Sequence, residues 1–131
     1  MSHQTIHPNG WLPAKGYANG ILAKDGTLHI GGQIGWDANK KIVQGGFIPQ
    51  MTQALRNIAA IVEAAGGEIS DVARLTWFVT DKSEYLANQS EVGAAYREVF
   101  GKHFPAMSMI MVSGLVEDEA MVEIEATAHI C

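Results

Sequence analysis

The sequence predicts an α+β fold in which two helices cover one face of a mixed sheet. Residues 48–67 and 83–105 carry the apolar periodicity of amphipathic helices. Other segments are rich in β-branched and aromatic residues or alternate apolar with polar side chains, which is typical of strands. The predicted order is β-β-β-α-β-α-β-β, in which the third strand is a short extended piece after the first two, and elements in this order form a two-layer fold.

The composition fits a single globular domain over residues 1–131. Apolar residues make up 47% of the chain and charged residues 18%, which excludes intrinsic disorder. The net charge is -5 and no run of Lys or Arg occurs, so we expect no nucleic-acid partner. No apolar stretch reaches the roughly 18 residues of a membrane helix, and the lone Cys131 fits a reducing compartment. We therefore expect a cytoplasmic protein without membrane contact.

The N-terminal third of the chain predicts a hairpin after an irregular lead-in. Residues 1–16 contain Pro and Gly turn signals and no clear periodicity. Residues 17–35 predict two strands joined by an Asp-Gly turn, which is a strong hairpin signal. Gly31 and Gly32 interrupt the second strand, which indicates a bulge or a close approach of the backbone to another group.

The first predicted helix has one buried stripe. Met51, Leu55, Ile58 and Val62 follow one another at spacings of four, three and four residues. This spacing places the four side chains on a single helical face, which is expected to pack on the sheet.

The second half of the chain predicts one more helix and three strands. The strands are expected at residues 71–81, 106–114 and 120–130. In the last of them apolar residues alternate with a row that includes Glu123 and Glu125, so one face is core and the other is polar. A second copy of the chain is a natural cover for that polar face. The inner side of the helix is expected to contain Leu86, Val92, Tyr96, Val99 and Phe100.

A row of methionines lies in the strand that begins at Ala106. Met107, Met109 and Met111 alternate along the sequence, so a strand would place all three on one face. Methionine usually fills gaps in a core. An apolar wall of a ligand pocket is the other interpretation, because such sites have few polar groups.

Several motifs resemble the RidA/YjgF family, also called L-PSP endoribonuclease, whose members include enamine/imine deaminases. The resemblance implies a chorismate-mutase-like fold of the Bacillus type and a homotrimer with small-molecule clefts between its subunits. The motifs are "GYANGI" (16–21), "IGGQIG" (30–35), the run 54–81, "FPAMS" (104–108) and "VEIEATA" (122–128).

The resemblance also implies a changed ligand site. Family deaminases hydrolyse 2-imino or 2-enamino acids to 2-keto acids and ammonia, and an arginine clamps the substrate carboxylate. Met107 stands at the position of that arginine, Met109 at a family cysteine and Gly93 at a family asparagine. Loss of a charge-assisted pair of this kind lowers the binding free energy of the substrate by about 2–5 kcal/mol. A different substrate preference is therefore expected.

Four other positions match the family's site. Tyr17, Gly31 and Gly32 correspond to substrate-binding positions, and Glu123 corresponds to the glutamate that orients the attacking water. The resemblance thus implies that Glu123 is a catalytic acid/base. From the sequence alone, without the resemblance, we would interpret Glu123 as a solvated strand residue and Tyr17 as a half-buried aromatic residue.

No metal site or cofactor is expected. The chain has five histidines, and none pairs with another at the spacing of metal ligands. His103 precedes the methionine strand and could supply a cation there, although a surface histidine is the simpler interpretation. Trp11, Trp36 and Trp77 could pack in loops or contact a ligand, and the sequence leaves both possibilities open.

Three functions remain open on the sequence. The first is a hydrolase of the imine/enamine deaminase type whose specificity diverges because of Met107. The second is a hydrolase or isomerase of a more apolar catabolic intermediate, and the third is a non-catalytic small-molecule-binding or chaperone-like trimer. Ribonuclease activity fits poorly with the acidic balance and the absence of a basic patch.

Overall fold

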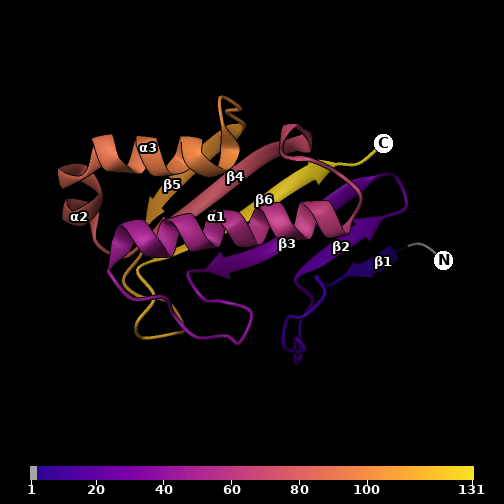
Figure 1. Cartoon of the computed structure of the whole chain (residues 1–131), viewed down its shortest axis with the longest axis horizontal. Helices are drawn as coiled ribbons and strands as arrows, with labels where there is room; N and C mark the ends of the chain where they lie inside the picture. Colours follow the sequence, from indigo (N-terminus) through magenta and orange to yellow (C-terminus); the bar gives the residue numbers. More distant parts are fainter. Residues whose placement is uncertain (1–2) are drawn as a thin grey trace.

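The computed structural model describes residues 3–131, which form a six-stranded sheet with the helices on one face (Figure 1). The strand order is β1-β2-β3-β6-β4-β5; β4 and β5 pair in parallel, and the other neighbours pair antiparallel. This arrangement confirms the predicted α+β class with a mixed sheet. The strands are β1 (His3–Ile6), β2 (Gly20–Ala23), β3 (Thr27–Ile34), β4 (Val72–Val79), β5 (Ala106–Met111) and β6 (Val122–His129). The helices are α1 (Phe47–Ala64), α2 (Lys82–Ala87) and α3 (Gln89–Phe100), with a 3-10 turn at Ile69–Asp71.

The predicted hairpin is formed by β2 and β3, which pair antiparallel. Gly26 has a φ of 93° in the connecting turn, a conformation that glycine adopts without steric cost. The backbone N–H of Thr27 donates a 2.9 Å hydrogen bond to Asp25 Oδ1 and closes the turn. The Asp-Gly turn signal is therefore confirmed.

Helix α1 packs its predicted stripe against the sheet. Met51, Leu55, Ile58 and Val62 are each 0% exposed, and Figure 1 shows α1 crossing in front of β3 and β6. Burial of each such side chain contributes about 1.5–3 kcal/mol. This stripe is consequently a main source of stability for the half of the sheet that contains β3 and β6.

Strand β4 runs through the interior of the sheet between β6 and β5. Its alternate residues Leu75, Trp77 and Val79 are almost fully buried beneath the helices. The residues between them face the opposite side, where they pair with Glu123 and Glu125 of β6. The predicted division of β6 into an apolar face and a polar face is therefore confirmed.

The N-terminal segment corrects one prediction. Residues 3–6, within the predicted irregular lead-in, form the edge strand β1 and pair antiparallel with β2. Ile6 is the one buried residue of β1, so no alternating pattern marks the strand. The predicted extended piece after the hairpin is not a strand of the sheet; in the described chain it forms an isolated bridge between Trp36 and Ile42.

The second predicted helix is divided in two. The structure has α2 and α3 in place of one helix over 83–105, with a break at Asn88, whose φ is -125°. The Asn88 side chain donates a 2.7 Å hydrogen bond to the Glu84 carbonyl and competes with the helical backbone pattern. The break also changes which side chain faces inward: Leu86 is 51% exposed, contrary to prediction, and Tyr85 packs against the core.

A buried amide ties α1 to the chain that follows β3. Asn57 is 4% exposed, and its Nδ2 donates to the carbonyls of Ile34, at 3.2 Å, and Trp36, at 2.9 Å. Its Oδ1 accepts a 2.9 Å hydrogen bond from Gln53 Nε2. Because buried carbonyls need partners, this one side chain fixes the end of β3 relative to the helix.

Replacement of Asn57 by Ala should lower the free energy of unfolding by about 1–3 kcal/mol. The Trp36 carbonyl would lose its side-chain donor, and the Ile34 carbonyl would keep only the Trp36 N–H. Urea denaturation followed by circular dichroism measures this loss. Arg56→Ala on the same helix is the matched control: its side chain is exposed and pairs only with the exposed Glu98, so it should cost about 1 kcal/mol or less. Equal losses in the two variants would contradict the anchoring role of Asn57.

Candidate functional site

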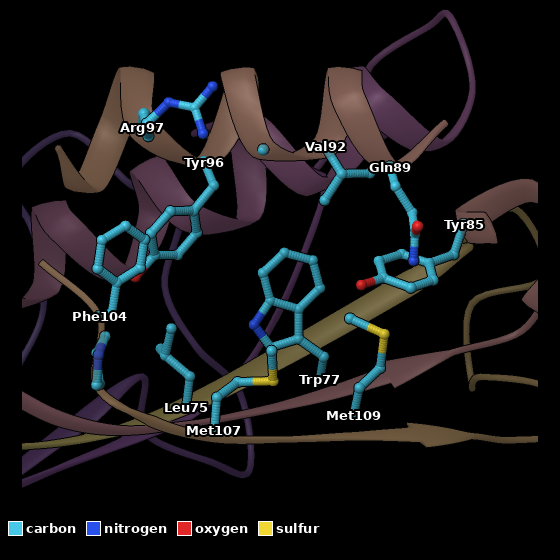
Figure 2. Close-up of a pocket in the computed structure, with 12 residues that line it drawn as sticks. Leu75, Trp77, Tyr85, Gln89, Val92, Tyr96, Arg97, Phe104, Met107 and Met109 are labelled. Carbon is cyan, nitrogen blue, oxygen red and sulfur yellow. The ribbon is translucent and has the colours of Figure 1, made fainter. Parts of the chain in front are cut away.

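A hollow of about 290 Å³ lies between α3 and the part of the sheet formed by β4 and β5 (Figure 2). This volume is close to the lower end of the range for small-molecule sites. Most of the lining is apolar or aromatic, so the hollow suits a compact ligand with a large apolar part. The lining residues are Leu75, Trp77, Tyr85, Gln89, Val92, Gly93, Tyr96, Arg97, Phe104, Pro105, Met107 and Met109.

The methionines reach the hollow because of the parallel pairing of β5 with β4. Met107 pairs with Leu75 and Met109 with Trp77, so both methionines share the face that α3 covers. Met107 is 49% exposed, whereas Met109 is partly buried against the core. Met111 is on the same face but does not line the hollow. The structure thus places both predicted methionines in a pocket wall.

Trp77 lies in the centre of the lining, and Figure 2 shows Tyr96 on one side of its indole ring and Met109 on the other. The side chain is 2% exposed, and its Nε1–H has no hydrogen-bond acceptor among the described residues. A buried donor without an acceptor is uncommon and costs free energy. This tryptophan therefore belongs to the hollow, a role the sequence could not separate from loop packing.

The aromatic end of the hollow is held rigidly. The rings of Tyr96 and Phe104 stack with their centroids 5.6 Å apart, and the Tyr96 hydroxyl donates a 2.6 Å hydrogen bond to the His103 carbonyl. Burial raises the pKa of Tyr96 to about 12, so its hydroxyl remains a donor at neutral pH. His103 Nε2 lies 2.7 Å from the Val72 carbonyl and donates to it. The His103 ring is therefore committed to the backbone rather than to the hollow.

Arg97 is the one charged residue in the lining formed by the described chain. It lies on α3 one turn beyond Gly93, and a Cβ on Gly93 would be 3.2 Å from Arg97 Nη1. Arg97 was not among the site residues predicted from the sequence. The four-residue spacing from Gly93 was the available signal, because residues i and i+4 are neighbours on a helix.

A second surface lies around the two glycines of β3. The register with β6 shifts at Gly31 and Gly32, which confirms the predicted bulge. The Gly31 N–H donates a 2.8 Å hydrogen bond to the Asn19 carbonyl. A Cβ on Gly32 would lie 2.5 Å from Glu123 Oε2, so the Glu123 side chain lies directly against the bare backbone.

Glu123 has an unusual environment for a strand carboxylate. It is half-buried, and its carboxylate accepts no hydrogen bond from the described residues. Burial raises the pKa of Glu123 above its ordinary value, and the negative charge of Glu125 raises it further. Such a carboxyl group is better matched to proton transfer near neutral pH than an exposed glutamate.

Tyr17 lies in the loop that leads to β2 and is 48% exposed. Lys40 Nζ is 5.3 Å from the centroid of its ring and donates a 2.9 Å hydrogen bond to the Pro13 carbonyl. Trp11 and Trp36 line a small cavity of about 10 Å³ beside Tyr17, which is space for about one water molecule. These two tryptophans therefore pack in loops.

The structure brings together some predicted site residues and separates others. Glu123 lies with Gly32 on the face away from the helices, and Gly31 binds the loop that carries Tyr17. Met107 and Met109 lie on the helix-covered face, with β4 between their strand and β6. Within one chain, Glu123 and the methionine wall are thus on opposite faces of the sheet.

Residues 3–131 contain neither a cluster of metal ligands nor a membrane-spanning helix. No three His, Cys, Asp or Glu side chains gather there as metal ligands would. Within the same residues, none of the helices is both long and apolar enough to cross a membrane.

The layered fold defines an α+β domain that carries an apolar hollow on one face of its sheet and a half-buried glutamate on the other. The chain belongs to the RidA/YjgF family: residues 9–130 match the family model described as endoribonuclease L-PSP. The motif resemblance in the sequence is thereby confirmed at the level of the family.

Individual relatives agree with this assignment. The chain is 35% identical over 113 residues to the 2-iminobutanoate/2-iminopropanoate deaminase of Capra hircus, covering 86% of this chain and 78% of the goat protein. It is 39% identical over 130 residues to a RutC family protein of Pyrococcus horikoshii, covering 98% of both. The crystal structure of the Escherichia coli YjgF gene product matches with a TM-score of 0.81 and 33% identity, covering 96% of this chain and 98% of that one.

Glu123→Gln is expected to raise the free energy of unfolding at pH 8, because it keeps the shape and removes a charge that burial disfavours. The folded-state pKa of Glu123 is raised, so the ionised form destabilises the fold above that pKa. The destabilisation disappears as the pH falls through the raised value toward the unfolded one. Urea denaturation at pH 8 and at pH 4, at one protein concentration, measures the difference.

Glu117→Gln, at an exposed loop position, is the matched control and should show no such pH-dependent gain. A Glu123→Gln protein that is less stable than the wild type at pH 8 would mean that the ionised carboxylate has a stabilising partner.

Proposed function

We propose that this protein is a hydrolase of the imine/enamine deaminase type whose specificity diverges because Met107 occupies the place of the carboxylate-binding arginine. The observation that carries the proposal is Glu123, a half-buried carboxyl with a raised pKa held against the bare backbone of Gly32. The 35% identity to a 2-iminobutanoate/2-iminopropanoate deaminase supports the same reaction class.

In the proposed reaction, water adds to the carbon of a C=N bond. Glu123 accepts a proton from the attacking water and delivers it to the nitrogen. The hydroxyl proton of the resulting tetrahedral intermediate then moves to the nitrogen, the C–N bond breaks, and ammonia leaves a carbonyl behind, so imine plus water gives ketone plus ammonia. The lack of a hydrogen bond to Glu123 from the described residues leaves its oxygens available for that water.

The proposed assembly is a cytoplasmic homotrimer with clefts between its subunits. Glu123 and Met107 lie on opposite faces of one sheet, so a shared cleft requires that a neighbouring subunit supply one of the two surfaces. The glutamate-bearing face also carries apolar surface suited to an interface: Ile110 is 44% exposed and pairs with Phe78 of β4.

One observation favours a second candidate, a hydrolase or isomerase of a more apolar catabolic intermediate. Aromatic side chains and two thioethers form much of the wall of the hollow. They would accept a larger hydrophobic body than the one- or two-carbon side chains of 2-iminopropanoate and 2-iminobutanoate. A non-catalytic binding or chaperone-like trimer would use the same hollow without Glu123. The activity of Glu123 variants separates the non-catalytic candidate from the two enzymes.

The deaminase proposal predicts accelerated release of ammonia from imines that an amino-acid oxidase generates from several amino acids. Glu123→Gln should lower the rate constant by about 10²–10⁴-fold, because the positioned proton acceptor is lost. Glu117→Gln, at an exposed loop position that does not line the hollow, should retain the wild-type rate. Sedimentation velocity on the same sample should show a trimer.

Three outcomes would count against the proposal. No acceleration with any imine, while an authentic deaminase is active alongside, would favour the binding or chaperone-like candidate. A fully active Glu123→Gln protein would remove Glu123 from the mechanism. A monomer in sedimentation would remove the inter-subunit cleft.

Met107→Arg should raise kcat/KM for 2-iminopropanoate, because a guanidinium forms a bidentate pair with the substrate carboxylate. A gain of between about tenfold and a thousandfold corresponds to a restored charge-assisted anchor. Steady-state kinetics with imines derived from alanine and from phenylalanine measures it. Met107→Leu, which keeps the wall apolar and uncharged, should show no gain, and an equal gain in the Leu variant would contradict a carboxylate anchor.

A further inference from the structure

The guanidinium of Arg97, on the helix above the hollow, lies beside Gly93, which has no side chain. Arg97 lies one turn after Gly93 on α3, and Figure 2 shows its side chain running along that helix. A Cβ on Gly93 would be 3.2 Å from Arg97 Nη1, which is tighter than ordinary van der Waals contact. The bare backbone at Gly93 therefore leaves the space that the guanidinium occupies.

Arg97 has no charged partner among residues 3–131. The ion pair found in this part of the chain joins Arg56 to Glu98, and no hydrogen bond involves the Arg97 guanidinium. The side chain lines the hollow and is exposed on its other side. A guanidinium at the rim of an apolar cavity, free of protein carboxylates, is a ready receptor for a carboxylate from solution.

The floor of the hollow provides a second, independent indication of a ligand. Trp77 is 2% exposed, and its Nε1–H has no acceptor within the described chain. The half-exposed Met107 side chain, which also lines the hollow, is unbranched and flexible, so an entering group can move it. A ligand oxygen or imine nitrogen beyond Met107 would then satisfy the indole donor.

We propose that Arg97 is the anion receptor of this hollow and that the ligand is a carboxylate with an aromatic body. The carboxylate lies at the rim with Arg97, and the ring lies among the aromatic and thioether side chains of the lining. A cavity of about 290 Å³ suits a compound with a single ring. Met107 on β5 lacks the positive charge of the family arginine, and Arg97 supplies a positive charge from α3, on the other side of the hollow.

The identity of that carboxylate as an aromatic 2-imino acid rests on the proposed function. The binding of an aromatic carboxylate by Arg97 does not rest on the proposed function, because it can be measured with the stable 2-keto acid and without turnover. Phenylpyruvate carries both the ring and the carboxylate, phenylacetone carries the ring with a ketone and no carboxylate, and pyruvate carries the carboxylate without the ring.

Isothermal titration calorimetry with these three probes tests the inference. The wild-type protein should bind phenylpyruvate at least tenfold more tightly than either of the other two. Arg97→Gln should weaken phenylpyruvate about tenfold, the effect of losing one partly exposed charge-assisted pair, and leave phenylacetone unchanged. Arg56→Gln, which removes a surface arginine away from the hollow, should change none of the three affinities.

Gly93→Ala provides a test that leaves Arg97 itself intact. The new Cβ would require the Arg97 guanidinium to shift by a few tenths of an ångström. Binding of phenylpyruvate should therefore weaken, by less than in Arg97→Gln, and binding of phenylacetone should not change. Alanine is the better helix former at this position, so the variant should be at least as stable as the wild type. Loss of affinity therefore cannot be ascribed to unfolding, which circular dichroism checks.

Absence of phenylpyruvate binding to the wild type, or equal binding to the wild type and Arg97→Gln, would overturn the inference. Binding that depends on Arg97, together with no release of ammonia from any imine, would support the inference and overturn the proposed function. If Arg97→Gln leaves imine hydrolysis unaffected, for the phenylalanine-derived imine as well as the small ones, the proposed function would be supported and the inference about Arg97 overturned.

Discussion

The register of β4 with its two neighbours controls the arrangement of both candidate surfaces. Its inward row, which includes Leu75 and Trp77, faces the same side as the methionines of β5, and its outward row faces the same side as the glutamates of β6. Side chains alternate strictly along a strand, so a slip of one residue would exchange the two faces. The apolar hollow and the Glu123 surface are thus separated by one sheet, and each keeps a distinct environment.

This separation gives the two surfaces different chemistry. The hollow lies under α3, where apolar and aromatic side chains form most of the wall and Arg97 supplies a positive charge at the rim. The Glu123 surface carries the carboxylates of Glu123 and Glu125 and, further along β4, the guanidinium of Arg74. An assembly that joins the two surfaces would place an anion receptor, an apolar wall and a proton acceptor around one space.

Much of the fold could be predicted from local patterns. The stripe of α1, the turn at Gly26 and the polar row of β6 each follow from a short-range rule, and the structure confirms all three. The edge strand β1 could not be predicted, because it is held by backbone pairing to β2 and buries only Ile6. The break at Asn88 depends on one side chain competing for a helical carbonyl, which a periodicity analysis cannot detect.

The candidate site was predictable only in part. The shared face of the methionines follows from alternation, and the bulge follows from adjacent glycines. That Met107 and Glu123 lie on opposite faces depends on the strand order, in which β4 separates β5 from β6. The relation of Arg97 to the hollow, and the unpaired donor of Trp77, depend on how α3 packs over the sheet. Such contacts join residues distant in sequence, so no local pattern marks them.

The close approach of Glu123 to Gly32 links two positions that are far apart in the chain. A Cβ at residue 32 would overlap the carboxylate of residue 123, so a larger residue at the first position is compatible only with a shorter or reoriented one at the second. Substitution at either position is therefore expected to change which residues the other tolerates. Removal of the glutamate side chain would free space for a Cβ at residue 32.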